Sequence, residues 1–237
     1  VSATGDIDVL RGIVKGKELI QHLADAFAVP PRDSGSGLIR CTTENRGVSF
    51  GFTDTVVHTG ELLFCSLLAS RAARHLAKLY AALGAEEKAA EHSSLHDKLR
   101  GIIPQTFMCA DGYLKSSTGL SSQADVWGTA FAAYEDLLTP AARSAACEAI
   151  LTGYKKGAIA WRGNIRHVPT THDYSKDSSW ERTTGVPINT YQNGAYWATA
   201  TGWVADTLAR RDSRAASELM AEYVSDLRST DFRMGEE

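Results

Sequence analysis

The fold class is decided by residues 62–84, which read LLFCSLLASRAARHLAKLYAALG. Leucines recur there at helical spacing, for example at Leu63, Leu67 and Leu76, and a closing glycine is typical of the position just past a helix end. A second helical pattern follows after a short turn, over residues 86–107. Because a short connection favours antiparallel neighbours, we expect a helical hairpin here.

The same organisation recurs along the rest of the chain. Thr139 and Pro140 are residue types preferred at the cap and at the first position of a helix. No linker rich in Pro, Gly or Ser divides the sequence, and no convincing series of strand patterns occurs. We therefore predict an all-α fold in one domain over residues 1–237. Further helices are expected over residues 6–27, 124–138, 139–154, 190–210 and 213–227.

Composition narrows the range of partners. The formal net charge is -3, with no basic stripe, so nucleic acid is not expected as a partner. No apolar run approaches the roughly 20 residues that cross a bilayer, so a membrane is not expected either. A cytoplasmic location is favoured, and secretion stays open if a signal segment lies upstream.

A metal or cofactor is not expected. His92 and His96 have the i, i+4 spacing of metal ligands on one helix face. However, the glutamate that accompanies such a pair in the His-Glu-x-x-His motif is missing.

Three segments combine aromatic residues or glycine with a carboxylate or amide, directly before a helical pattern. They are FGFTD at residues 50–54, QADVWG at 123–128 and TYQNGAYW at 190–197. Free backbone N–H groups at helix starts favour anions and hydrogen-bond acceptors. An isolated aspartate in such a place is most often a helix cap, but the repetition in three segments favours a functional interpretation.

The chemistry of these segments fits a sugar pocket. Aromatic faces pack on the C–H faces of a pyranose, while Asp, Asn, Gln and Arg bind its hydroxyls. Hydrolysis of a glycosidic bond needs two carboxyl groups, one protonated and one ionised. The candidates are Asp54, Glu61, Asp125 and Glu181.

The sequence resembles the six-hairpin glycosidases, which are (α/α)6-toroid enzymes. The likeness runs from about residue 5 to 230 and rests on the ladder of hairpins and on four motifs. These motifs are GFTDTVVHTGELL at 51–63, DVWG at 125–128, Arg166-His167 and YQNGAYWAT at 191–199.

The resemblance implies a ring of helical hairpins with a carbohydrate site at one mouth and no metal. Asp54 is then the best candidate for the catalytic acid, with Asp125 or Glu181 as its partner. The substrate would be an oligosaccharide or polysaccharide. The candidate substrate-binding residues are His58, Trp127, Arg166, His167, Trp180, Tyr191, Gln192, Asn193, Tyr196 and Trp197.

One departure from the family concerns size, because a complete toroid has more helices than this sequence predicts. We therefore expect an incomplete arc of a toroid. Such an arc would expose apolar stripes on its first and last hairpins, which usually need a partner. This predicts self-association through the end hairpins.

Other functions stay open on the sequence alone. Basic residues gather around the long loop after residue 157, which suggests an acidic sugar held by guanidinium groups, although exposed arginines are common. A polysaccharide lyase or sugar epimerase could instead use His167, Tyr196 and Asn193 to move a proton. A non-catalytic carbohydrate-binding or assembly protein is a third reading. The basic residues are Arg162, Arg166, His167 and Arg182.

Overall fold

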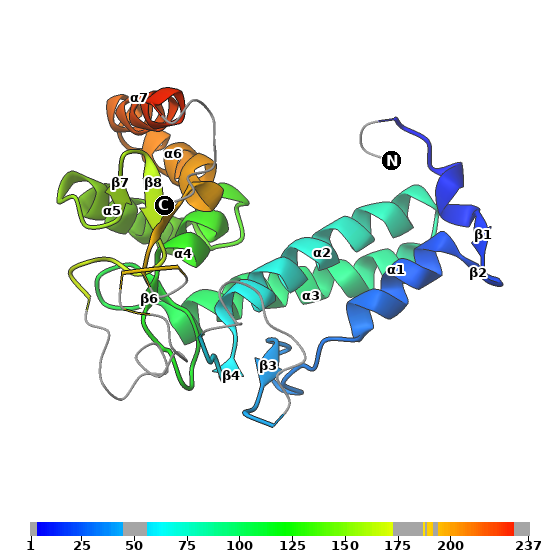
Figure 1. Cartoon of the computed structure of the whole chain (residues 1–237). Coiled ribbons are helices and arrows are strands. Elements are labelled where there is room, and N and C mark those ends of the chain that lie inside the picture. Colours follow the sequence, from blue (N-terminus) through cyan, green and yellow to red (C-terminus); the bar gives the residue numbers. More distant parts are fainter. Residues whose placement is uncertain (1–3, 45–55, 173–186, 188, 192–193, 230–237) are drawn as a thin grey trace.

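The computed structural model describes residues 4–44, 56–172, 187, 189–191 and 194–229. Its two longest helices pack side by side as one hairpin, and α1 lies along the far end of this hairpin (Figure 1). The other four helices gather at the opposite end of the hairpin from α1. The helices are α1 (Leu19–Ala28), α2 (Leu63–Ala82), α3 (Glu86–Phe107), α4 (Val126–Tyr134), α5 (Pro140–Lys155), α6 (Thr201–Ala209) and α7 (Ser213–Ser229), with 3-10 turns η1 (Asp8–Arg11) and η2 (Ala198–Ala200).

Short strands form four small antiparallel sheets, so the prediction of an all-α fold is wrong, and so is that of a toroid or an arc of one. The fold is mixed. The strands are only two or three residues long, too short to show the alternation by which strands are recognised in a sequence. They are β1 (Ile13–Val14), β2 (Lys17–Glu18), β3 (Arg40–Cys41), β4 (Gly60–Glu61), β5 (Leu114–Lys115), β6 (Ala124–Asp125), β7 (Ala160–Trp161), β8 (Asn164–Arg166) and β9 (Tyr196–Trp197).

The sheets join the starts of three helices. Strands β4, β6 and β9 come just before α2, α4 and α6 in the chain. Leu62, directly after β4, forms a β-bridge with Ser117, which follows β5. This bridge links β4 to the β5–β6 pair. The backbone N–H of Val126 donates to the carbonyl of His167 at 2.8 Å, which ties α4 to the β7–β8–β9 sheet. The residues around these helix starts are therefore held together by backbone hydrogen bonds.

The main core lies between the α2–α3 hairpin and helices α4 to α7. Phe64 of α2 stacks on Phe131 of α4, with 5.0 Å between ring centroids. An ion pair at the core's edge adds a polar link, since Arg74 contacts Glu135 at 2.8 Å. A second, smaller core lies under α1 and is made of Leu10, Ile20, Leu76, Tyr80 and Ala89.

Several helix boundaries agree with the sequence. Helix α3 covers the predicted residues, and Gly84 after α2 has the positive φ of +76° expected past a helix end. Thr139 caps α5, where its side chain accepts a hydrogen bond from the N–H of Ala142 at 3.4 Å. None of the helices in the described ranges is long and apolar enough to cross a membrane.

Three predicted helices are shorter than expected. The one predicted over residues 124–138 is α4 alone, because β6 occupies its first two positions and α4 ends at Tyr134. Residues 6–27 do not form one helix, because a β1–β2 hairpin interrupts them at Lys15 and Gly16, which both have positive φ. Such a pair is the usual centre of a two-residue hairpin turn. The last part of the predicted 190–210 helix is α6, whereas β9 and η2 occupy its start.

The turn between β7 and β8 gives a test of this packing. Gly163 has a φ of +77°, and an added Cβ would lie 2.3 Å from the backbone nitrogen of Tyr223 in α7. Gly157 has a similar φ of +65°, but an added Cβ there meets no described atom within 4 Å. Both Gly→Ala changes should lose about 1–2 kcal/mol through backbone strain. Gly163→Ala should lose roughly 1–3 kcal/mol more, because α7 must move.

Urea denaturation of the two variants measures the difference directly. Equal losses of the free energy of unfolding would mean that α7 does not pack on this turn.

Candidate active site

Asp125 stands at the start of α4, where its side chain caps the helix. Its Oδ1 accepts a hydrogen bond from the N–H of Gly128 at 2.7 Å, and only 2% of the residue is exposed. Gly128 has no room for a side chain, because a Cβ there would lie 2.6 Å from Asp125 Oδ2 and 2.6 Å from Leu63 Cδ2. The DVWG motif is thus a buried cap in close contact with α2.

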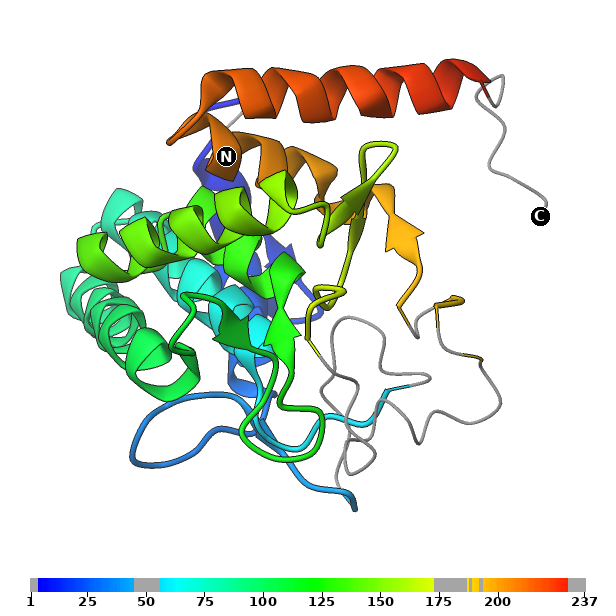
Figure 2. The ribbon, with the colours of Figure 1, turned by 90° about the vertical axis from the view of Figure 1, so that its left-hand side faces the viewer.

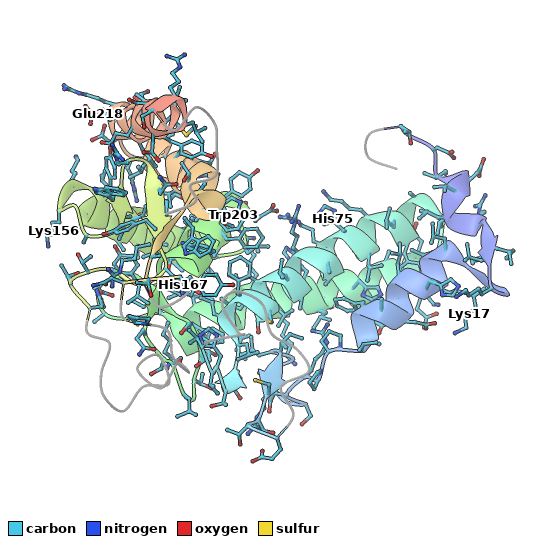
Figure 3. All side chains as sticks on the ribbon, viewed as in Figure 1. Lys17, His75, Lys156, His167, Trp203 and Glu218 are labelled. Carbon is cyan, nitrogen blue, oxygen red and sulfur yellow. The ribbon has the colours of Figure 1, made fainter. Side chains whose placement is uncertain are left out.

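His167 lies against this cap and comes from a distant part of the chain. Its Nε2 is 3.2 Å from Asp125 Oδ1, and its ring meets the Trp127 indole edge-on, with 5.2 Å between centroids. The Trp127 Nε1 donates to the carbonyl of Ile165 at 3.3 Å. Asp125, Trp127 and His167 are all buried. Figure 3 shows the labelled His167 side chain beside the start of α4. The structure therefore brings together three of the residues predicted from the sequence.

Burial decides how this pair is protonated. It raises the pKa of the Asp125 carboxyl to about 7, although hydrogen bonds from the backbone N–H groups of Gly128 and Trp127 act in the opposite direction. Burial also lowers the pKa of His167 to about 3. Near neutral pH the imidazole is therefore uncharged, and the carboxyl still holds a proton in a large fraction of molecules. A carboxyl in this state can donate a proton, as a general acid does.

A second aromatic group lies on the neighbouring sheet. Trp161 of β7 is 57% exposed, and its ring centroid is 6.2 Å from that of Tyr196 on β9. The guanidinium carbon of Arg162 lies 5.0 Å from the centroid of the Trp161 ring. We call Trp161, Arg162 and Tyr196 the aromatic platform. Sequence reasoning did not select Trp161 as a site residue, although an exposed tryptophan beside a turn is a signal that could have identified it.

The other predicted binding residues divide into those near the platform and those elsewhere. Trp197 packs against Tyr191, with 5.7 Å between ring centroids, and donates from Nε1 to the Tyr191 carbonyl at 3.2 Å. Arg166 is buried on β8, opposite Tyr196 in the strand register. His58 is buried as well, and its carbonyl accepts from the Sγ of Cys41 at 3.1 Å.

Of the remaining carboxylate candidates, the structure describes Glu61. Glu61 lies on β4, where its side chain accepts a hydrogen bond from the Thr118 hydroxyl. The others, together with some predicted sugar contacts, lie outside the described residues: Asp54, Trp180, Glu181, Arg182, Gln192 and Asn193. Among the residues that the structure does describe, no group of three or more His, Cys, Asp or Glu side chains could hold a metal ion.

Comparisons with known proteins indicate the fold. No family model matches the chain, and no curated protein matches it either. The fold is similar to that of a solved structure named "Sialidase". The TM-score is 0.65 at 12% sequence identity, and the match covers 87% of this chain and 20% of that chain. The chain thus spans about a fifth of the length of the structure it matches. This likeness shows only that the chain shares its fold with part of that structure, and it does not single out the six-hairpin glycosidases.

The protonation of Asp125 can be tested through stability. Between about pH 4 and 7 the folded protein keeps a proton on Asp125 that the unfolded chain has released. The contribution of Asp125 to stability therefore falls as the pH rises through this window. Asp125→Asn removes this pH dependence. The free energy of unfolding that the variant loses relative to the wild type should therefore be largest near pH 4 and shrink toward pH 7, by up to about 1.4 kcal/mol per pH unit.

The measurement is chemical denaturation of the wild type and the variant at several pH values. A loss that stays constant between about pH 4 and 6.5 would instead mean that Asp125 is an ionised carboxylate paired with a protonated His167.

Proposed function

We propose that this chain contributes a carbohydrate site to a glycoside hydrolase, with Asp125 as the group that protonates the leaving oxygen. The observation that carries the proposal is the buried carboxyl, whose raised pKa of about 7 lets it hold a proton near neutral pH. Glycosidic bond cleavage needs such a carboxyl, because an ionised carboxylate cannot donate a proton to the leaving group.

His167 and Trp127 support this role of Asp125. An uncharged imidazole 3.2 Å from Asp125 Oδ1 can donate a hydrogen bond from Nε2–H to that oxygen and hold the orientation of the carboxyl, which leaves Oδ2 to carry the proton that is transferred. The buried indole of Trp127 beside the imidazole keeps the surroundings apolar, and this desolvation sustains the raised pKa of Asp125. The sequence favoured Asp54 as the acid, with Asp125 or Glu181 as its partner. In this proposal Asp125 is the acid, and the second carboxylate would be Asp54 or Glu181.

The aromatic platform supplies the sugar contacts in this proposal. The exposed face of Trp161 is suited to the C–H face of a pyranose, and Tyr196 extends the aromatic surface. Arg162 has an exposed side chain next to this surface and is 3.5 Å from Asp226. A guanidinium at the edge of a sugar platform favours substrates with a carboxylate, such as uronic acids.

Asp125→Asn tests the catalytic role without removing the helix cap, since asparagine caps helices as well as aspartate does. We expect the release of reducing ends from neutral and uronic-acid oligosaccharides to fall by at least about 100-fold, the usual effect of losing a general acid. Asp212→Asn is the matched control. Asp212 also caps a helix, accepting from the N–H of Ala215 at 3.1 Å, but it lies at the start of α7.

Unchanged turnover by a folded Asp125→Asn variant would exclude Asp125 as the acid. An unsaturated, ultraviolet-absorbing product would point to a lyase instead.

A second function, carbohydrate binding without turnover, is favoured by one observation. Asp125 is only 2% exposed, and its Oδ1 is engaged as a helix cap, as in a purely structural role. Glycan affinity in the wild type without any turnover would support this second function.

Glycan binding can be tested separately from turnover. Trp161→Ala should weaken glycan affinity by about 3- to 10-fold, because it removes one aromatic face from the platform. Tyr134→Ala is the control, since Tyr134 is 43% exposed but lies at the end of α4. Calorimetric titration with oligosaccharides measures both. Equal affinity in the wild type and Trp161→Ala would remove the platform from the proposal.

A further inference from the structure

The turn within the aromatic platform has a strained backbone. Arg162 and Gly163 connect β7 to β8, and both have positive φ, at +50° and +77°. In a two-residue hairpin turn of this geometry, asparagine, aspartate or glycine usually takes the first position. An arginine in the left-handed region costs about 1–2 kcal/mol. Strain of this kind is found most often at functional sites, so the position of the Arg162 guanidinium at the tip of the hairpin calls for a functional explanation.

Helix α7 holds this side chain. Figure 2 shows the tip of the β7–β8 hairpin directly below the C-terminal half of α7. The Asp226 carboxylate of α7 makes two contacts there: its Oδ1 lies 3.5 Å from Nη1 of Arg162, and its Oδ2 accepts a hydrogen bond from Nδ2 of Asn164 at 3.0 Å. The same Nδ2 donates to the carbonyl of Arg162 at 3.2 Å. One carboxylate is thus linked to both the side chain and the backbone of Arg162.

The backbone of the turn has further supports. The carbonyl of Gly163 accepts a hydrogen bond from the buried hydroxyl of Thr201 at 2.8 Å. The Cα of Gly163 also lies close to the backbone of Tyr223 in α7. Because these contacts do not involve Asp226, a change at Asp226 should alter the orientation of the Arg162 side chain and leave the hairpin in place.

The two charged partners differ in exposure. The Asp226 side chain is 18% exposed, whereas that of Arg162 is 54% exposed. A guanidinium carries several N–H donors in one planar fork, so it can contact Asp226 and a ligand carboxylate at the same time. Asp226 is therefore placed to act on a ligand through Arg162.

We propose that Asp226 is a positioning residue, which holds the Arg162 guanidinium beside Trp161 so that the platform binds sugars with a carboxylate more tightly than neutral sugars. The inference rests on the proposed carbohydrate site and makes α7 a determinant of its substrate class. The guanidinium carbon lies 5.0 Å from the centroid of the Trp161 ring. A carboxylate on a pyranose that packs on this indole can then form charge-assisted hydrogen bonds with the same guanidinium.

Calorimetric titration with two matched oligosaccharides, one neutral and one with a uronic acid at the same position, tests the inference. The readout is the ratio of the two affinities. Asp226→Asn should lower the preference for the acidic sugar by about 3- to 10-fold, because the guanidinium loses its fixed orientation. The affinity for the neutral sugar should stay unchanged, since Trp161 is retained. Arg162→Gln should remove the preference altogether.

Glu218→Gln is the matched control for Asp226→Asn. Glu218 also pairs with an arginine, Arg214, at 2.8 Å, and it lies on the same helix about two turns before Asp226. This variant removes a similar ion pair from α7 without touching the turn. It should therefore keep the wild-type ratio of the two affinities.

Two further readouts separate orientation from charge. In a chain that already carries Arg162→Gln, Asp226→Asn should not change the ratio any further, because the two residues act as one unit. The Nε–H resonance of Arg162 in an NMR spectrum should be shifted by the ring current of Trp161. In Asp226→Asn it should move toward its ordinary position, with no glycan present.

Tighter binding of the acidic sugar by Asp226→Asn would mean that Asp226 only neutralises Arg162, and this would overturn the inference. So would an Arg162 resonance that Asp226→Asn leaves in place. A wild type with equal affinity for both sugars would also overturn it, but would keep the proposed carbohydrate site. A wild type that binds neither sugar would reject both.

Discussion

The arrangement depends on a backbone hydrogen bond between two segments that are distant in sequence, from the N–H of Val126 to the carbonyl of His167. This bond holds the start of α4 against the three-stranded sheet. It therefore sets the distance between the Asp125 carboxyl and the His167 imidazole. Gly128 adds a second constraint at the start of α4, because a side chain there would collide with Asp125 and with Leu63 of α2.

The same constraint explains the electrostatics of the pair. A carboxyl at a helix start normally becomes more acidic, because free N–H groups stabilise its negative charge. Here the short strands and Trp127 exclude water, and the loss of solvation outweighs those hydrogen bonds in setting the pKa of Asp125. One aspartate can thus be a structural cap and still hold a proton at neutral pH, so a cap and a functional carboxyl need not be alternatives.

The sequence predicted features that depend on neighbours along the chain. The Thr139–Pro140 helix start, the glycine after α2 and the place of Asp125 before a helix all follow from local preferences. It could not predict the sheets, because strands of two residues are defined by partners far away in the chain. The Lys15–Gly16 turn was overlooked within an apparent helical pattern. The Asp125–His167 contact joins residues about forty positions apart, which no local pattern reveals.

The small separate core under α1 has a consequence for how the molecule opens. Phe27 packs against both this core and the main one. Regions joined by few shared contacts can unfold locally, while the rest of the molecule stays folded. The amides of residues 4–28 should then exchange with solvent through their own partial opening. The N-terminal segment would act as a separate cooperative unit, with a lower free energy of opening than the helices around α4.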